Sequence, residues 1–191
     1  MKNIIKYSML MVYGLTTLAC KTEMVDRIDL DALENGGYVR TVSPFPVAAN
    51  SFNYSLANLA GAKMEFLAEA VTPNKGAAFA SYDLSVRFVD LTPANGNKTG
   101  TVQVVKSIPA SAFTKDPTTG YPRATITVTA NEAITASKAA LVDVIDGDRF
   151  EITGTMKLTD GKTFTATNTG LNITGGAFYS SPFSYRVNVV K

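Results

Sequence analysis

The chain has 191 residues, with 18 basic and 16 acidic side chains, one cysteine, and neither histidine nor tryptophan. The absence of histidine excludes Ser-His-Asp and Cys-His catalysis, HExxH zinc sites and a histidine base acting near neutral pH. No basic stripe or arginine run is present. The sequence therefore lacks the clustered positive face that binding to nucleic-acid phosphates requires.

The first 19 residues have the pattern of a lipoprotein signal peptide. A short basic start with Lys2 and Lys6 precedes an apolar run from Tyr7 to Ala19. This pattern is typical of a secretory signal, and the run is too short to span a bilayer. Because small Ala19 directly precedes the only cysteine, we expect cleavage before Cys20 and acylation of that residue, which would hold the protein on a membrane. The alternative is a soluble secreted protein in which Cys20 is a leftover thiol.

Residues 20–36 are predicted to form a lipidated acidic tether, because Asp26, Asp29, Asp31 and Glu34 repel one another and the segment lacks sheet alternation. Loss of residues 1–19 leaves 16 of the 18 basic side chains against 16 acidic ones, so the remaining chain is formally neutral. Residues 37–191, about 155 in number, suffice for one domain with a sizeable core.

From Gly37 onward, short runs of β-branched and aromatic residues alternate with Gly, Pro, Asn and Asp, which is typical of a sandwich or barrel. The pattern predicts an all-β fold, an immunoglobulin-like antiparallel β-sandwich with one short helix. Period-2 alternation predicts which side chains share a face. In residues 63–71 it sets Met64, Phe66, Ala68 and Ala70 against Lys63, Glu65, Leu67 and Glu69. In residues 82–91 it places Tyr82, Leu84, Val86 and Phe88 inward, and in residues 182–190 Phe183, Tyr185, Val187 and Val189 alternate. The expected strands span residues 37–43, 51–56, 63–71, 82–91, 99–108, 123–130, 149–158, 162–168 and 182–190.

Two connections have their own signals. Asn131 followed by alanines predicts a helix over residues 131–141, capped by that asparagine and lying across one end of the sandwich. Asp160-Gly161 predicts a type I′ turn between the strands at 149–158 and 162–168, with φ positive at both residues.

The densest acidic cluster comprises Asp143, Asp146 and Asp148 around Gly147. Oxygen ligands around a glycine turn suit calcium, although the spacing of an EF-hand is missing. The alternative interpretation is a solvated turn before a strand.

Aromatic residues in loops are candidates for contact with a ligand or a partner. Tyr121 lies beside Arg123 in a turn-rich loop, where the ring could stack on a sugar or anchor a protein, or instead fold back on the sandwich edge. Tyr179 belongs to a second aromatic group with Phe178 and Phe183, some of which must be core.

Four stretches are considered together, namely residues 36–41, 108–113, 158–164 and 181–189. They resemble small surface lipoproteins associated with SusC/SusD-type outer-membrane nutrient importers. Each stretch is a sandwich-type segment, and together they reach across nearly the whole chain after the signal. The resemblance implies an accessory role beside an importer and carries no catalytic motif.

We therefore expect a non-enzymatic, lipid-anchored protein of the outer membrane that faces the cell exterior. It would be an accessory or ligand-capturing subunit of a nutrient-uptake complex, with importer subunits as protein partners and a glycan or peptide as ligand. No cofactor is expected apart from the calcium considered above. The first alternative is a structural or adhesive surface protein. A carboxylate-dependent glycan hydrolase is the remote alternative, since catalysis by paired carboxylates needs two groups that face each other.

Overall fold

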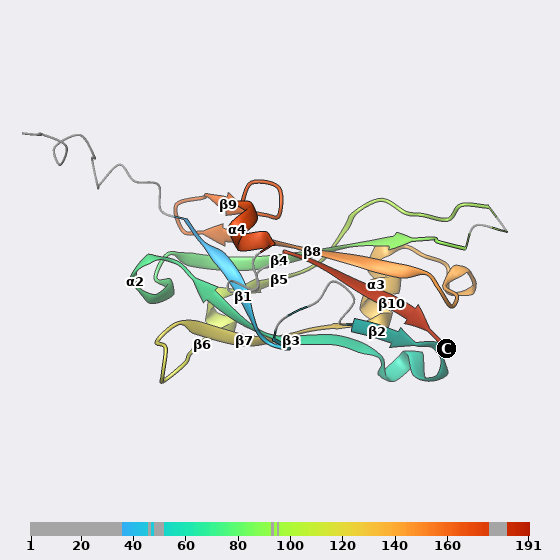
Figure 1. Ribbon diagram of the computed structural model, residues 1–191, viewed down its shortest axis with the longest axis horizontal. Helices are drawn as coiled ribbons and strands as arrows, with labels where there is room; N and C mark the ends of the chain where they lie inside the picture. The colour runs from blue at the N-terminus through green and yellow to red at the C-terminus, as the bar shows by residue number, and fades with distance from the viewer. Residues whose placement is uncertain (1–35, 46, 48–51, 93, 95, 176–182) are drawn as a thin grey trace, which may run out of the picture. The chain divides into compact units, whose positions relative to one another are not determined.

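The computed structural model describes residues 36–45, 47, 52–92, 94, 96–175 and 183–191. All of them belong to one unit of the chain, Asn35–Lys191. Cys20, the predicted signal peptide, the predicted tether and Tyr179 lie outside the described residues. The described residues form two β-sheets with a few short helices between the strands (Figure 1).

The smaller sheet has four strands, all antiparallel. Its long central pair is β3 and β7, with Met64 opposite Val128 and Phe66 opposite Ile126. The pairing of β1 with β3 shifts register between Thr41 and Ser43. In sheet order, the strands are β1 (Tyr38–Ser43), β3 (Lys63–Val71), β7 (Pro122–Thr129) and β6 (Thr114–Lys115).

The larger sheet has six strands and contains one parallel pair. Strand β2 runs parallel to β10, with Phe52 opposite Val187, so the prediction of a wholly antiparallel sandwich is wrong there. Alternation of side chains has period two in either strand direction, so it could not reveal this orientation. In sheet order, the strands are β2 (Phe52–Ser55), β10 (Ser184–Val190), β8 (Arg149–Leu158), β4 (Phe79–Val89) and β5 (Gln103–Pro109), with β9 (Thr163–Phe164) paired to β8.

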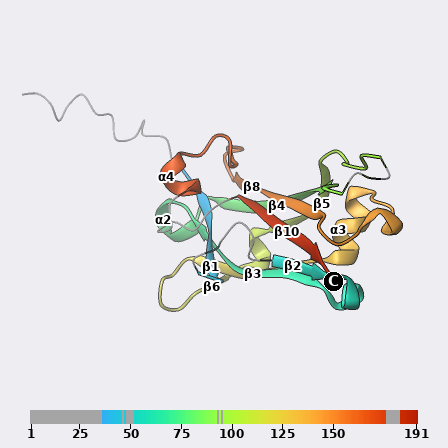
Figure 2. The ribbon, with the colours of Figure 1, turned by 45° about the vertical axis from the view of Figure 1, so that its right-hand side comes forward.

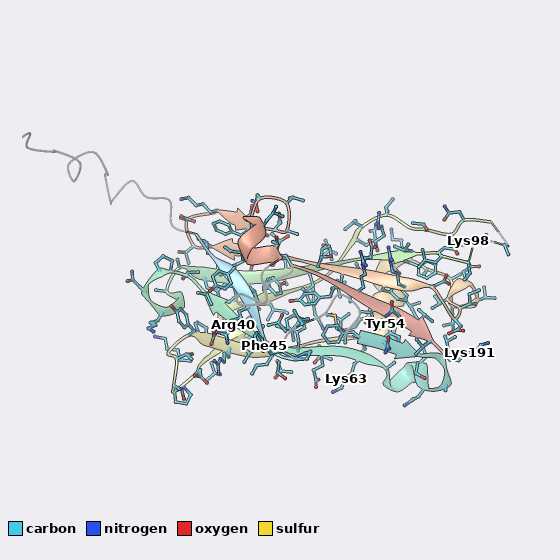
Figure 3. The ribbon with its side chains drawn as sticks, in the orientation of Figure 1. Arg40, Phe45, Tyr54, Lys63, Lys98 and Lys191 are labelled. Atoms are coloured by element: carbon cyan, nitrogen blue, oxygen red, sulfur yellow. The ribbon has the colours of Figure 1, made fainter. Side chains whose placement is uncertain are left out.

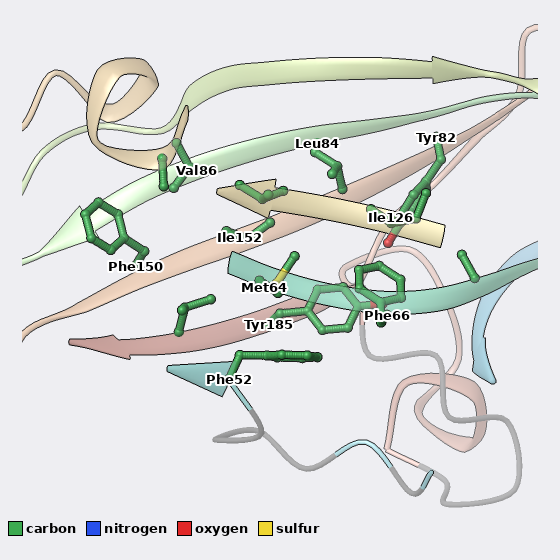
Figure 4. Close-up of a cluster of buried hydrophobic side chains, with 14 of the residues drawn as sticks. Phe52, Met64, Phe66, Tyr82, Leu84, Val86, Ile126, Phe150, Ile152 and Tyr185 are labelled. Carbon is green, nitrogen blue, oxygen red and sulfur yellow. The ribbon is translucent and has the colours of Figure 1, made fainter. Parts of the chain in front are cut away.

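The core lies between the facing sides of the two sheets (Figures 2 and 4). The rings of Phe66 on β3 and Tyr185 on β10 stack with centroids 4.6 Å apart. The Tyr54 hydroxyl on β2 donates to the carbonyl of Val128 on β7 at 2.9 Å. The inward-facing residues predicted on β3, on β4, on β10 and directly before β10 are buried, which confirms those alternations: Met64, Phe66, Ala68, Ala70, Tyr82, Leu84, Val86, Phe88, Phe183, Tyr185, Val187 and Val189.

The predicted helix is present, but it starts and ends earlier than expected. Helix α3 (Ala130–Ser137) is capped by Thr129, whose hydroxyl accepts from the backbone of Glu132, while the Glu132 carboxylate accepts from the backbone of Thr129. This capping box satisfies two backbone donors at once, so Asn131 is not the cap. Lys138, with φ of 59°, ends the helix in the left-handed conformation. In the described chain, α3 is the one helix longer than six residues.

The β8–β9 hairpin is confirmed, but its turn differs from the prediction. Gly161 has a positive φ of 87°, whereas Asp160 does not. The backbone of Gly161 donates to Leu158, and that of Leu158 donates to Lys162. Asp160 instead accepts from the backbone of Lys162 through its side chain at 3.0 Å. One left-handed glycine therefore suffices, as in three-residue hairpin loops.

Candidate functional site

A pocket of about 370 Å³ opens at the end of the sheets where β3 finishes and the described chain starts. Its walls come from the start of β1, the end of β3, the turn before β7 and the short helix α4 (Leu171–Thr174). The volume lies in the range of small-molecule sites, which combine apolar walls with few polar groups. The lining residues are Gly36, Gly37, Tyr38, Val71, Thr72, Pro73, Tyr121 and Ile173.

The rim of this Tyr121 pocket contains a left-handed backbone turn. In α2 (Pro73–Gly76), φ is positive at three consecutive residues: 54° at Asn74, 57° at Lys75 and 83° at Gly76. Such conformations in non-glycine residues cost on the order of 1–3 kcal/mol each and are found at ligand clamps and active sites. Thr72 holds the turn, because its carbonyl accepts from Gly76 and its hydroxyl accepts from Ala78, both at 3.3 Å.

The left-handed turn places Lys75 over the Tyr121 ring, with the ammonium nitrogen 4.8 Å from the ring centroid. This is a cation–π contact, and it leaves Lys75 exposed at the pocket rim. Tyr121 itself is half-buried and forms a pocket wall. Tyr121 thus packs partly against the edge of the sandwich, as in one interpretation of the sequence. It also lines a pocket where a ligand could contact it, as in the other.

Arg123 lies next to this site but is engaged in ion pairs within the protein. Its guanidinium contacts Glu69 at 2.6 and 2.7 Å and Asp116 at 2.7 Å. Glu69 is only 2% exposed, and it also contacts Arg40 at 3.6 Å and accepts from Thr119 at 3.2 Å. Arg123 therefore acts as a positioning residue for the turn that carries Tyr121.

Asp116 closes the same turn. Its Oδ1 accepts from the backbone of Thr118 at 3.1 Å and of Thr119 at 2.8 Å. The hydrogen bond from the Thr119 backbone, with the nearby positive charge of Arg123, lowers the pKa of the Asp116 carboxyl. The turn is thus closed by an ionised carboxylate, which makes the wall formed by Tyr121 well defined.

The three aspartates predicted as a calcium site are not assembled into one. Asp148 is 1% exposed, and its carboxylate accepts from the backbones of Leu91 and Ile145 and from the Thr92 hydroxyl. Asp146 accepts from the backbone of Lys191 at 3.1 Å. Within the described residues, no three acidic side chains come together in a group that could hold a metal ion. The segment is a turn before β8, but it differs from the solvated turn of the alternative interpretation because Asp148 is buried.

Several pocket residues were not singled out from the sequence. Tyr38, Ile173 and Lys75 come from segments far apart in the chain, and only the fold brings them beside Tyr121. The triplet Asn74-Lys75-Gly76 did carry a signal, since Asn and Gly are the residues that tolerate positive φ. Chemically, the site offers an ammonium group, two phenol rings and apolar walls, which suit binding of a small ligand or side chain.

Comparison of the chain with family models, curated proteins and solved structures found no match. Among the described residues, no helix combines the length and the apolar character needed to cross a bilayer.

Proposed function

We propose that the protein is a non-enzymatic, lipid-anchored surface protein that captures a ligand as an accessory subunit of an outer-membrane nutrient-uptake complex. The observation that carries the proposal is the Tyr121 pocket, in which two tyrosines and an apolar wall meet an exposed lysine. Tyrosine rings offer a flat apolar face to a sugar or a peptide side chain, and the phenol adds a polar contact.

The strand order supports an immunoglobulin-like sandwich as the scaffold. In that fold, one sheet has the order A-B-E-D, and the other contains C, F and G, with C′ added beside C in variable-type domains. The orders β1-β3-β7-β6 and β10-β8-β4-β5 correspond to A-B-E-D and G-F-C-C′. Sandwiches of this class present their loops at the two ends, and the Tyr121 pocket is formed by such loops.

The proposed location at the membrane rests on the sequence. Cys20 follows a basic start, an apolar run and a small residue, the pattern that favours a lipid-modified amino terminus over a free thiol. The resemblance to lipoproteins associated with SusC/SusD-type importers favours the outer membrane, the exterior face and an importer subunit as partner.

Several carboxyls of the described chain are held in ion pairs with lysines or arginines. A carboxylic acid that serves as general acid needs a raised pKa. In the described part of the chain the pKa is instead lowered at Glu65, Asp83, Asp116, Glu132 and Glu151. At Glu151, for example, burial raises the pKa, but the hydrogen bond and charge of Arg87 and the charge of Arg149 outweigh it.

A structural or adhesive surface protein is the second candidate, favoured by aliphatic side chains exposed at the other end of the sheets. An uncovered final strand would also have favoured a protein partner. Strand β10 offers no such edge, because it lies between β2 and β8.

The chain lacks tryptophan, so Tyr121→Trp introduces a single fluorescent reporter into the pocket. In the Cys20→Ser background, we expect tryptophan emission to change in a saturable way with one class among neutral oligosaccharides, uronate-containing oligosaccharides and short peptides. Lys75→Met, which keeps the apolar stem and removes the charge, should weaken binding of an anionic ligand and leave a neutral one unaffected.

Phe45→Trp is the matched control, because Phe45 is 58% exposed and does not line the pocket. Emission from this variant should not respond to the same probes. A response of equal size from both reporters, or no response at Tyr121→Trp to any probe, would contradict a ligand site at this pocket.

A further inference from the structure

A row of charged side chains borders the Tyr121 pocket on the outer face of the smaller sheet. The strand register places Arg40 of β1 opposite Glu69 of β3, and Glu69 opposite Arg123 of β7. We call these three residues the charged row. Residues two positions apart along a strand share a face of the sheet. Three pocket walls therefore adjoin the charged row, namely Tyr38 next to Arg40, Val71 next to Glu69 and Tyr121 next to Arg123.

Side-chain contacts connect the charged row to the turn that carries Tyr121. The Nη1 atom of Arg40 lies 3.6 Å from Oε1 of Glu69. The other carboxylate oxygen of Glu69 accepts from the Thr119 hydroxyl at 3.2 Å, and that hydroxyl accepts from the backbone of Tyr121 at 3.4 Å. Figure 3 labels Arg40 in the half of the described unit that also holds α2. The Arg40 guanidinium therefore lies beside the pocket by contact as well as by register.

The donors of Arg40 are not used within the described chain. A guanidinium has five N–H donors, and a separation of 3.6 Å from Glu69 is too long for a hydrogen bond. The buried Nε of Arg40 has no hydrogen-bond partner among the described residues. Glu69 is bound instead by Arg123, at 2.6 and 2.7 Å. Because the Arg40 side chain is 38% exposed, its Nη atoms are available to a carboxylate from outside the protein.

The charges next to the pocket favour an anion. Both carboxylates of this region, Glu69 and Asp116, contact Arg123 within 2.7 Å. The ammonium of Lys75 lies over the Tyr121 ring at the pocket rim, and no described carboxylate forms an ion pair with it. The charged row, Asp116 and Lys75 together have one positive charge in excess. Arg40 and Lys75 are the two cations that remain without a close carboxylate.

The rings and the cations together restrict the class of ligand. A neutral sugar would stack on Tyr38 or Tyr121 but leave both cations unused. An acidic peptide side chain would use the cations but present no ring to the tyrosines. A uronate, which is a sugar ring that bears a carboxylate, complements both features of the site.

We propose that the Tyr121 pocket binds a uronate unit of an acidic oligosaccharide, with the sugar ring on the tyrosines, the carboxylate bound by Arg40 and the anion attracted by Lys75. This assignment rests on the proposed function, since it names the ligand class for the same pocket.

The test uses the Tyr121→Trp reporter in the Cys20→Ser background, titrated with trigalacturonate and with the neutral galactotriose of the same linkage. Trigalacturonate should bind at least roughly tenfold more tightly, which is the worth of one hydrogen bond between charged groups. Arg40→Gln should remove most of this preference. Added sodium chloride should weaken binding of trigalacturonate more than binding of galactotriose, because salt screens exposed charges.

Arg186→Gln is the matched control. Arg186 is an exposed arginine on β10 of the larger sheet, so this change removes the same charge away from the pocket. The variant should keep the affinity and preference of the parent. Circular dichroism checks that each variant is folded. Lys75→Met, at the exposed rim, provides a second variant that should weaken trigalacturonate binding even if Arg40→Gln does not fold.

Equal affinity for the two sugars would overturn the uronate assignment and leave ligand capture at the pocket intact. Equal loss of trigalacturonate affinity in Arg40→Gln and Arg186→Gln would also overturn it, because the effect would then be one of overall charge. A response to triglutamate with none to either sugar would assign the pocket to acidic peptides instead. The absence of any response to sugars and peptides alike would contradict both this assignment and the proposed function.

Discussion

Three tyrosine hydroxyls lie inside the core, and their environment determines how the protein responds to alkali. Burial raises the pKa of Tyr185 to about 12, against an opposing effect of the hydrogen bond to Thr41. Burial also raises the pKa of Tyr54 and of Tyr82 well above the ordinary value of 10.0. An ionised phenolate in this core would be charged and desolvated.

From these shifts we predict alkaline unfolding above pH 10. A phenol with a folded pKa above its unfolded pKa stabilises the fold fully below the unfolded value, and this stability is lost as pH rises through the folded value. For Tyr185 this stability is lost between pH 10.0 and about pH 12. The loss amounts to about 2–3 kcal/mol of the free energy of unfolding. Because the chain has no histidine, no histidine titration alters its stability near neutral pH.

The measurement combines tyrosinate absorbance with circular dichroism during a pH titration. Ionisation of Tyr54, Tyr82 and Tyr185 should coincide with loss of the β-sheet signal, at a pH above the ordinary phenol pKa of 10.0. Titration of Tyr54, Tyr82 and Tyr185 near pH 10 with the β-sheet signal intact would contradict the prediction.

Arg123 illustrates what the sequence could and could not indicate about single residues. An arginine beside Tyr121 suggested a ligand contact, but the structure pairs it with Glu69 and Asp116. Alternation correctly placed Glu69 on the outer side of β3, away from Met64 and its inward neighbours. Alternation could not show that Arg123 and Thr119 would cover Glu69. It predicts the side of the sheet on which a residue lies, but not which other residues pack on that side.

At the scale of elements, the bounds of β3 and β8 were predicted correctly because both strands alternate without interruption. The sequence also contained the signature of the helix start, Thr129 followed three residues later by Glu132, but Asn131 was preferred as the cap. The expected strand at 162–168 is reduced to the two residues of β9. Hydrogen bonds from Thr165 to Asn168, through backbone and hydroxyl, form a local turn that competes with the sheet there.

The left-handed turn of α2 yields a prediction for this element. A Cβ on Gly76 would lie 2.4 Å from Cδ of Pro122, and φ there is +83°. Gly161 has a similar φ of +87° with nothing within 4 Å of its Cβ position. We expect Gly161→Ala to lower the free energy of unfolding by about 1–2 kcal/mol, the cost of a left-handed alanine. Gly76→Ala should lower the free energy of unfolding by about 1–3 kcal/mol more than Gly161→Ala does, because Pro122 must also move.

Urea unfolding of the two variants in the Cys20→Ser chain measures the difference. Gly76→Ala should also displace the Tyr121 wall and weaken any ligand response of the Tyr121→Trp reporter, whereas Gly161→Ala should not. Equal destabilisation by the two substitutions would show that the contact with Pro122 is unimportant.

At the scale of the whole molecule, the sequence indicated an all-β fold and the approximate places of nine of the ten strands in the described chain, and it missed the two-residue strand β6. It did not indicate the partners of those strands, so neither the parallel pairing of β2 with β10 nor the meeting of Tyr38, Lys75 and Tyr121 could be predicted. Periodicity in the sequence indicates the conformation of each segment by itself. The Tyr121 pocket is formed by four separate segments, so its formation depends on which segments become neighbours in the fold.

The predicted lipid anchor concerns the whole protein as well. We expect Cys20→Ser to move the protein from the membrane fraction to the soluble fraction, because the residue that would be acylated is lost. Fractionation of cells that express each form measures the shift, with Cys20 retained in the control. Unchanged partitioning would show that acyl chains are not what holds the protein on the membrane.

The central place of β10 in its sheet determines when the protein can finish folding. Strands β2, β4 and β8 are all synthesised before β10, yet β10 is what joins β2 to β8. Without β10 the larger sheet is split between β2 and β8, and its apolar side lacks Tyr185, Val187 and Val189. The larger sheet can therefore be completed only after all its other strands have been synthesised.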